Sequence, residues 1–163
     1  MAERAIRVFG DPVLKSPCAQ IGAIDSGIRA LVTDLLDSVR VPGRAGVAAP
    51  QIGIGVRAFS YNVDGNVGYV LNPEVVELRG DRELIGEGCL SVPGLWHPTP
   101  RHPYARVRGL NLAGEVVELA GEGLMAQALQ HESDHLDGLL YLDRLERDER
   151  RAAMRLVRES DWF

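Results

Sequence analysis

The sequence predicts an α+β domain with an antiparallel sheet. Segments with helical patterns lie towards the two ends of the chain, at residues 25–40, 122–137 and 144–159. Residues 56–119 between them read instead as short strands and turns. Strands that follow one another without intervening helices favour antiparallel pairing, whereas a βαβ alternation would indicate a parallel sheet. Because 163 residues suit one core, we expect residues 1–163 to form a single domain.

The first helix is predicted over residues 25–40. Its apolar residues recur at helical spacing, and they are Ile28, Leu31, Val32, Leu35, Leu36 and Val39. Asp25 or Ser26 can cap its N-terminus, and the Val-Pro-Gly that follows ends the helix.

Three short strands are predicted over residues 56–63, 68–72 and 74–78, which are rich in β-branched and aromatic residues. Residues 106–119 resemble a hairpin that turns at Ala113–Gly114. Successive short strands of this kind support the antiparallel sheet.

Two further helices follow the strands. The second covers residues 122–137, and Gly138 is placed to end it. The third covers residues 144–159, and its apolar side comprises Leu145, Ala152, Ala153, Leu156 and Val157. Mixed charges on its other side indicate a solvated face, and a large partner bound through this helix is the alternative.

Composition excludes several classes of protein. A net charge of −5 argues against non-specific binding to nucleic acid, and we expect no DNA partner. We expect no membrane association, because the sequence has no run of about 18 apolar residues. The N-terminus lacks the apolar core of a secretory signal, which predicts a cytoplasmic protein. Cytosolic thiols stay reduced, so Cys18 and Cys89 are not expected to form a disulfide.

The motif HESDH, residues 131–135, lies on the second predicted helix. Residues four apart share one helical face, so the imidazoles of His131 and His135 can reach one metal ion. Glu132 lies about 100° around the helix from His131. It can therefore accept a proton from a water that the metal activates. The alternative is a helix with two half-buried, hydrogen-bonded histidines.

A catalytic metal site usually has three protein ligands and one open position. Tyr141 occupies the position where metzincin-type proteases have their third histidine. The remaining candidates for a third ligand are Glu159, His97, His102 and Cys89. A buried structural thiol is the alternative for Cys89, and the residues alone do not decide between these candidates.

Three motifs together resemble the peptide deformylase family. They are GVAAPQIG at residues 46–53, EGCLS at 87–91 and QHESDH at 130–135, in the family's order. GDPVL at residues 10–14 resembles the family's N-terminal segment. The resemblance implies antiparallel sheets around a central helix that carries HExxH, in a single catalytic domain. It implies hydrolysis of the formyl group of N-formylmethionine on nascent polypeptides, with release of formate. The ribosome is a further candidate partner.

Matched by position, the resemblance implies roles for eight residues. The metal ligands are Cys89, His131 and His135. Glu132 is the general acid and base, while the Gln51 amide and the Leu90 backbone N–H stabilise the oxyanion. The backbones of Gly46 and Gly88 lie along the substrate. The implied metal is Fe²⁺, with Zn²⁺, Ni²⁺ or Co²⁺ as alternatives.

Departures from the family pattern keep other functions open. Arg44 replaces the first glycine of GxGLAA, Val47 replaces its leucine, and Gln127 lies on the inward helix face near the methionine pocket. These changes concern peptide preference and rate, or indicate an impaired paralogue. A zinc endopeptidase that uses His131, His135 and Glu159 is a second enzymatic hypothesis.

Two structural expectations complete the site. A metal-stabilised binding module would need a fourth protein ligand, such as His97 or His102. Glu87 is expected to pair with Arg101 behind the cysteine loop and so fix its geometry.

Overall fold

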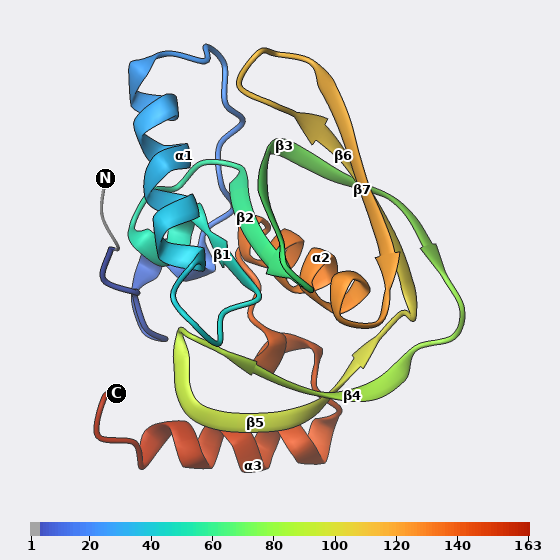
Figure 1. The fold of residues 1–163 in the computed structure, drawn as a ribbon. Coiled ribbons are helices and arrows are strands. Elements are labelled where there is room, and N and C mark those ends of the chain that lie inside the picture. The colour runs from blue at the N-terminus through green and yellow to red at the C-terminus, as the bar shows by residue number, and fades with distance from the viewer. Residues whose placement is uncertain (1–3) are drawn as a thin grey trace.

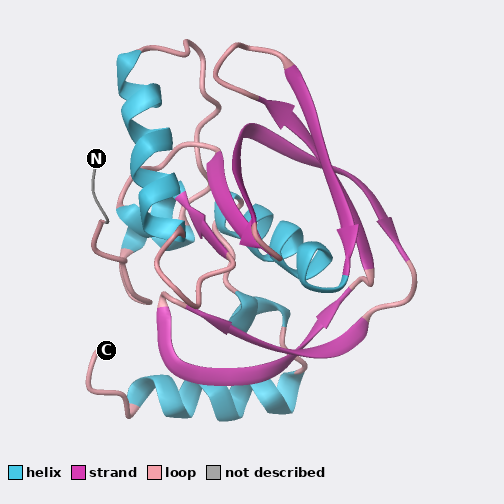
Figure 2. Cartoon of the chain, in the orientation of Figure 1, coloured by secondary structure: helices cyan, strands magenta, loops and turns pink. Residues whose placement is uncertain are grey.

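The computed structural model describes residues 4–163. It contains two antiparallel sheets and three α-helices, which confirms the predicted α+β class. The larger sheet and two helices form the upper part of Figure 1, and a two-stranded sheet lies below them against the C-terminal helix. Figure 2 shows that long connections without regular structure are confined to the first part of the chain and to turns.

The larger sheet has five antiparallel strands in the order β1-β2-β3-β6-β7. Its strands are β1 Gly46–Ala48, β2 Ala58–Val63, β3 Asn66–Arg79, β6 Tyr104–Leu110 and β7 Val116–Glu122. The predicted hairpin of residues 106–119 corresponds to β6 and β7, which pair antiparallel. The two strands predicted at 68–72 and 74–78 are parts of the single long strand β3. Its register is interrupted between Leu71 and Glu74, where Asn72 has a φ of 48°.

The second sheet consists of β4 Glu83–Cys89 and β5 Val92–Arg101, paired antiparallel. Three prolines in β5 hide this strand from sequence patterns, because proline lacks the backbone donor that a central strand needs. In a two-stranded sheet each strand has one edge without a partner strand, so β5 tolerates Pro93, Pro98 and Pro100. This pairing brings Cys89 to the end of β4, beside the turn that leads into β5.

The three α-helices are α1 Ser26–Val39, α2 Gly123–Leu136 and α3 Arg147–Arg158. Asp25 caps α1 as predicted, since its side chain accepts a hydrogen bond from the Ile28 N–H at 3.0 Å. α2 ends at Leu136, just before Gly138, as predicted, and Gly138 has a φ of 78°. These positions agree with the sequence to within about one residue.

The start of the third helix was predicted wrongly. Residues Tyr141–Arg144 form a separate 3₁₀ turn, η3, and α3 begins only at Arg147. Ala153 and Val157 face the core, but Ala152 and Leu156 are exposed. Met154 packs there instead, in the cluster beneath β5 that also holds Leu140 and Leu142. The buried face of α3 therefore lies part of a turn around the helix from the predicted apolar side.

α2 runs between the five-stranded sheet and β4. Ala126, Leu129 and Leu136 pack against Phe59 and Val107 of the sheet. On its other side, Gln127 donates to the Gly86 carbonyl of β4 at 3.0 Å. The helix is thus held on both sides, which fixes the direction of the side chains it presents towards β4.

The first residues of the described chain cross over the site loops. The Arg7 N–H donates to the Gln51 carbonyl at 2.7 Å, and the Phe9 N–H donates to the Ser91 carbonyl at 2.8 Å. Gln51 belongs to the 3₁₀ turn η2 Ala49–Ile52, and Ser91 follows Cys89. The same segment therefore connects two loops that lie far apart in sequence. Within residues 4–163 no helix is long and apolar enough to cross a bilayer.

Candidate active site

Three possible metal ligands converge where β4 meets α2. His131 and His135 stand one turn apart on α2, and Cys89 ends β4. The His135 Nε2 lies 3.2 Å from the His131 Nε2 and 3.5 Å from the Cys89 Sγ. All three ligand atoms lie within 4.8 Å of one another. The spacing of HExxH therefore has the geometric consequence that the sequence predicted.

These residues fit a divalent metal ion. Tetrahedral coordination with metal–nitrogen bonds near 2.1 Å and a metal–sulfur bond near 2.3 Å separates the ligand atoms by roughly 3.3–3.6 Å. The two nearest pairs in the structure, at 3.2 and 3.5 Å, lie within about 0.1 Å of that range. The His131 Nδ1 is already engaged with Glu87 at 2.6 Å, which leaves Nε2 to face the other two donors. Such a hydrogen bond behind a histidine is typical of metal ligands.

Charge also favours a cation. Burial lowers the pKa of His131, but the negative charges of Glu132 and of a Cys89 thiolate, with the hydrogen bonds to Cys89 and Glu87, outweigh burial and raise this pKa. Burial lowers the pKa of His135, so this imidazole is neutral and free to donate a lone pair. A cation at the ligand atoms would offset the negative charge gathered there.

The predicted pair of Glu87 and Arg101 is confirmed. The Arg101 Nε and Nη2 donate to the two Glu87 oxygens at 2.9 and 2.6 Å, and both side chains are buried. Burial alone would raise the pKa of Glu87, but the hydrogen bonds from Arg101 and His131 lower it to about 2. An ionised Glu87 therefore accepts from the His131 imidazole and holds its orientation.

This buried ion pair extends to the opposite side of α2. The Arg101 Nη1 donates to Asp134 at 2.8 Å, and Arg144 donates to both oxygens of Asp134 at 2.8 and 3.1 Å. Two arginines thus balance two carboxylates. The network ties β4, β5, α2 and η3 together directly behind the metal ligands.

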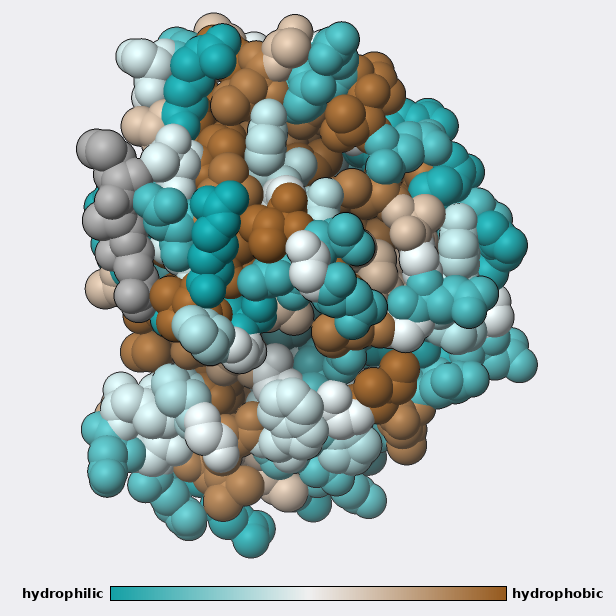
Figure 3. Space-filling view, in the orientation of Figure 1, coloured by the Kyte–Doolittle hydropathy of each residue, from teal (hydrophilic) through white to brown (hydrophobic). Residues whose placement is uncertain are grey.

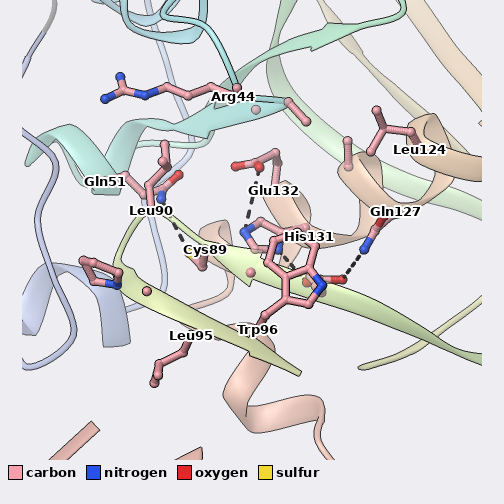
Figure 4. A pocket seen from close by; sticks show the side chains of 18 residues that line it. Arg44, Gln51, Cys89, Leu90, Leu95, Trp96, Leu124, Gln127, His131 and Glu132 are labelled. Atoms are coloured by element: carbon pink, nitrogen blue, oxygen red, sulfur yellow. Dashed lines mark hydrogen bonds and ion pairs between the residues drawn. The ribbon is translucent and has the colours of Figure 1, made fainter. Parts of the chain in front are cut away.

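Glu132 stands at the pocket wall opposite Cys89, with its Oε2 4.0 Å from the His131 Nε2 (Figure 4). Its side chain is almost fully buried, and its Oε1 has no hydrogen-bond partner within residues 4–163. Burial raises the pKa of Glu132 to about 7, although His131 opposes the shift. A carboxyl group in this condition can both accept and release a proton near neutral pH.

Gly46 makes room for Glu132. A Cβ added at Gly46 would lie 2.5 Å from the Glu132 Oε2. Any side chain at this position would displace the carboxylate. The requirement for glycine therefore has a steric cause, which the sequence alone did not reveal.

The Gln51 amide is held with its nitrogen towards the cysteine. Its Oε1 accepts from the Ala48 N–H at 3.0 Å, while its Nε2 donates to the Ser91 Oγ at 3.1 Å and lies 3.7 Å from the Cys89 Sγ. Leu90 follows Cys89 and, like Gln51, lines the pocket shown in Figure 4. Ser91 is a residue that sequence reasoning missed, and its place within EGCLS is the pattern that could have identified it.

The predicted residues surround one pocket of about 540 Å³. Of the eight residues singled out in the sequence, seven line it: Gly46, Gln51, Gly88, Cys89, Leu90, His131 and Glu132. The eighth, His135, is fully buried behind them. Figure 3 shows the surface hollowed between the upper body and the part that carries β4 and β5. The structure therefore brings together residues that lie up to 89 positions apart, from Gly46 to His135.

The sequence departures also lie around this pocket. Arg44 is at its rim, but the guanidinium points away from Cys89 and donates to the Ser38 carbonyl at 2.8 Å. Gln127 donates to the Gly86 carbonyl and to Glu87 at 3.0 and 3.3 Å. Val47 is fully buried in the core rather than in the pocket. None of the three contacts the ligand atoms.

The other candidate ligands lie elsewhere. His97 is buried beside α3, where its Nδ1 lies 2.7 Å from Glu149. His102 contacts the Gly80 carbonyl, and Glu159 is an exposed residue at the end of α3. Among the described residues, the cluster able to hold a metal contains Cys89 and not these three. Tyr141 is no ligand either, and its ring stacks on that of His131 at 6.5 Å.

Comparisons with known proteins find one family along most of the chain. The family model described as polypeptide deformylase matches residues 3–151. The peptide deformylase of Acidothermus cellulolyticus is 46% identical over 162 residues, covering 99% of this chain and 89% of that protein. Peptide deformylase 1 of Corynebacterium glutamicum is 40% identical over 167 residues, covering 100% and 99%.

Solved structures are similar along almost the whole chain. A peptide deformylase from Legionella pneumophila superposes with a TM-score of 0.89 at 34% identity, covering 97% of this chain and 95% of that one. The enzyme from Thermotoga maritima gives 0.84 at 35% identity, covering 90% and 100%. On the family match and these relatives, the chain belongs to the peptide deformylase family.

Proposed function

We propose that residues 1–163 act as one catalytic domain that hydrolyses the formyl amide of N-formylmethionine at the start of nascent polypeptides. The observation that carries this proposal is the convergence of Cys89, His131 and His135 beside the carboxylate of Glu132, in one pocket. The products are formate and a peptide with a free amino group. Family membership supports both the reaction and the substrate.

Each residue of the pocket has a distinct task in this reaction. Cys89, His131 and His135 would hold a divalent cation, which would supply Lewis acidity to lower the pKa of a water and polarise a carbonyl. Glu132 takes a proton from the attacking water and delivers it to the methionine nitrogen as the carbon–nitrogen bond breaks. The Gln51 amide and the Leu90 N–H donate to the oxyanion, and each such donor typically contributes about 3 kcal/mol. The backbones of Gly46 and Gly88 flank the extended substrate.

The proposed metal is ferrous iron, in line with the family resemblance. Two imidazoles and a thiolate also suit zinc, nickel and cobalt. Elemental analysis of protein purified without oxygen tests the assignment. One equivalent of iron that is lost in the variant Cys89→Ala is the expected result.

Release of formate from formyl-Met-Ala tests the proposed reaction. Metal-loaded protein should release formate, and Glu132→Ala should lose at least about 100-fold in kcat, the usual scale of a general base. The variant Glu122→Ala removes an exposed carboxylate that precedes the same helix and serves as the control. Absence of formate from the metal-loaded protein would overturn the proposal.

The second enzymatic hypothesis, an endopeptidase with Glu159 as the third ligand, makes a different prediction. It requires Glu159→Ala to abolish metal binding while Cys89→Ala spares it. The proposed site requires the reverse. The distances among Cys89, His131 and His135 support the proposed site.

The proposed ribosome contact would use α3. Its sequence, RDERRAAMRLVR, contains five arginines and two acidic residues, and most of these side chains are exposed. Clustered exposed arginines favour phosphate-rich partners. Cosedimentation with ribosomes, lost on replacing Arg151 and Arg155 by glutamate, is the expected result. Such an enzyme would act in the cytoplasm, where nascent chains emerge.

A further inference from the structure

Trp96 is the most exposed large apolar side chain among the described residues, at 71% exposure, and it lines the active-site pocket. Exposed tryptophans in a cleft are typical of binding positions, because the side chain offers a large, rigid apolar surface. The residue has no role in the chemistry proposed above. Its position therefore needs a separate explanation.

The hairpin of β4 and β5 has two distinct faces. His97, Thr99 and Arg101 of β5 point inward and are buried, whereas Trp96 points to the opposite face. On β4, Glu87 and Cys89 point inward to the metal ligands. This alternation, which follows from strand geometry, places Trp96 on the outer face of the hairpin.

Two glycines let Trp96 reach across β4. A Cβ at Gly86 would lie 2.6 Å from the Trp96 Nε1, and a Cβ at Gly88 would meet the six-membered ring. The indole therefore lies flat over β4 and extends to the edge that borders the pocket. Figure 4 shows it at the front of the view, across the pocket from Leu124. The glycine at position 88 thus accommodates Trp96 as well as a substrate.

We propose that Trp96 is a specificity-determining residue that receives the side chain of the second residue of the substrate. This inference rests on the proposed function, in which an extended peptide lies beside β4. If the methionine side chain points inward, towards Leu124 and Gln127 of α2, the next side chain points to the outer face. There it meets the indole. The enzyme therefore prefers an aromatic or large apolar residue directly after formylmethionine.

The test compares four peptides by kcat/KM: formyl-Met-Ala, formyl-Met-Phe-Ala, formyl-Met-Ala-Ala and formyl-Met-Ala-Phe. An aromatic contact of this kind corresponds to about a 2- to 10-fold preference. We expect formyl-Met-Phe-Ala to exceed formyl-Met-Ala-Ala by that factor, through KM rather than kcat. Trp96→Ala should remove the preference, and Trp96→Phe should retain most of it. Phenylalanine at the third position should bring no comparable gain.

The second tryptophan of the chain supplies the control. Trp162 lies near the C-terminus, where its Nε1 donates to the Pro93 carbonyl at 3.0 Å, and it does not line the pocket. Trp162→Phe should leave the peptide preference unchanged. It also makes Trp96 the only tryptophan. Binding of formyl-Met-Phe-Ala shields the exposed indole from water and should shift its emission to shorter wavelength in a Glu132→Gln background. This shift provides a readout of binding without turnover.

The possible outcomes separate the two proposals. Failure of every formyl peptide to release formate contradicts the proposed function. Equal kcat/KM for formyl-Met-Phe-Ala and formyl-Met-Ala-Ala, with formyl-Met-Ala still hydrolysed, overturns only the role of Trp96. A preference that persists in Trp96→Ala, or that follows the third residue instead of the second, also overturns it.

Discussion

The carboxylate of Glu132 reaches the pocket only because residue 46 has no side chain. Alanine at position 46 would place its Cβ 2.5 Å from the Glu132 Oε2, so the carboxylate would have to move. Small displacements of catalytic groups cost up to about 100-fold in rate. We predict that Gly46→Ala lowers kcat/KM for formyl-Met-Ala by at least about tenfold while the bound metal is retained.

Gly55→Ala is the matched control for this prediction. A Cβ at Gly55 has no neighbour within 4 Å, and the residue is exposed. Activity and metal content are measured for both variants. Equal kcat/KM for Gly46→Ala and the control would show that Glu132 does not depend on this glycine.

The two cysteines are predicted to differ in reactivity. Burial raises the pKa of Cys18, which disfavours the reactive thiolate. Cys89 lies in the pocket and is the proposed metal ligand. We predict that iodoacetamide modifies neither thiol in the metal-loaded protein, and that a chelator exposes Cys89 alone. Mass spectrometry of the digested protein gives the measurement, and rapid labelling of Cys89 with metal bound would contradict its role as a ligand.

For single residues, the sequence predicts a shared position where the spacing along a helix alone fixes it. His131 and His135 must share a helical face, so their convergence follows from the pattern alone. Cys89 and Gln51 required the family resemblance, because nothing local indicates that their loops meet α2. Ser91 was missed because its partner, Gln51, lies on a distant 3₁₀ turn. Trp96 was missed because its contacts depend on the register of β4 with β5. The sequence does not predict that register, because the three prolines of β5 obscure its strand pattern.

Among the secondary-structure elements, the C-terminus of α2 is fixed both by its own sequence and by a contact with a distant segment. Gly138 has a φ of 78°, and its N–H donates to the His135 carbonyl at 3.1 Å. A Cβ there would also lie 2.8 Å from the Lys15 carbonyl oxygen. The glycine in the sequence predicted where α2 ends, but not that the backbone of Lys15 lies against Gly138.

We predict that Gly138→Ala lowers the free energy of unfolding by about 1–3 kcal/mol, because it combines a left-handed backbone with a contact to backbone atoms. Urea denaturation gives the measurement. Gly22→Ala is the control, since Gly22 is exposed and a Cβ there has no neighbour within 4 Å. A loss no larger than that of Gly22→Ala would contradict the steric argument.

The third helix shows where element prediction fails. Charged residues fill the stretch from Arg144 to Arg151, so the few apolar residues constrain the helical phase poorly. Leu145 is buried as expected, but it precedes the helix and packs beside η3. Arg144 is engaged with Asp134 instead of extending the helix. A buried ionic partner supplied by a distant element thus overrides local helical preference.

For the whole molecule, the buried charges of Glu87, Arg101 and Asp134 join elements that the backbone hydrogen bonds do not connect. The more exposed Arg144 adds a second arginine to Asp134. β4 and β5 pair only with each other, and the larger sheet contains neither strand. Arg101 contacts Glu87 of β4 and Asp134 of α2 at once. These ion pairs therefore fix the sheet of β4 and β5 against α2, close to the point where the metal ligands meet. Sequence patterns predicted the helices and the strands β2, β3, β6 and β7, but not β1, β4, β5 or this cross-connection.

Removing Arg101 should consequently destabilise the whole domain. Arg101→Met keeps much of the side-chain volume but leaves Glu87 without its arginine and Asp134 with Arg144 alone. Loss of one partner of a buried ion pair costs about 3–5 kcal/mol, whereas exposed pairs contribute about 1 kcal/mol or less. We predict a loss of that larger size in urea denaturation, measured with a chelator present so that weakened metal binding does not add to it. Arg108→Met breaks the exposed contact with Glu118 and is the control. If both variants lose equally little, the small sheet is held by apolar packing against α3 and η3, and the buried charges serve only to orient His131.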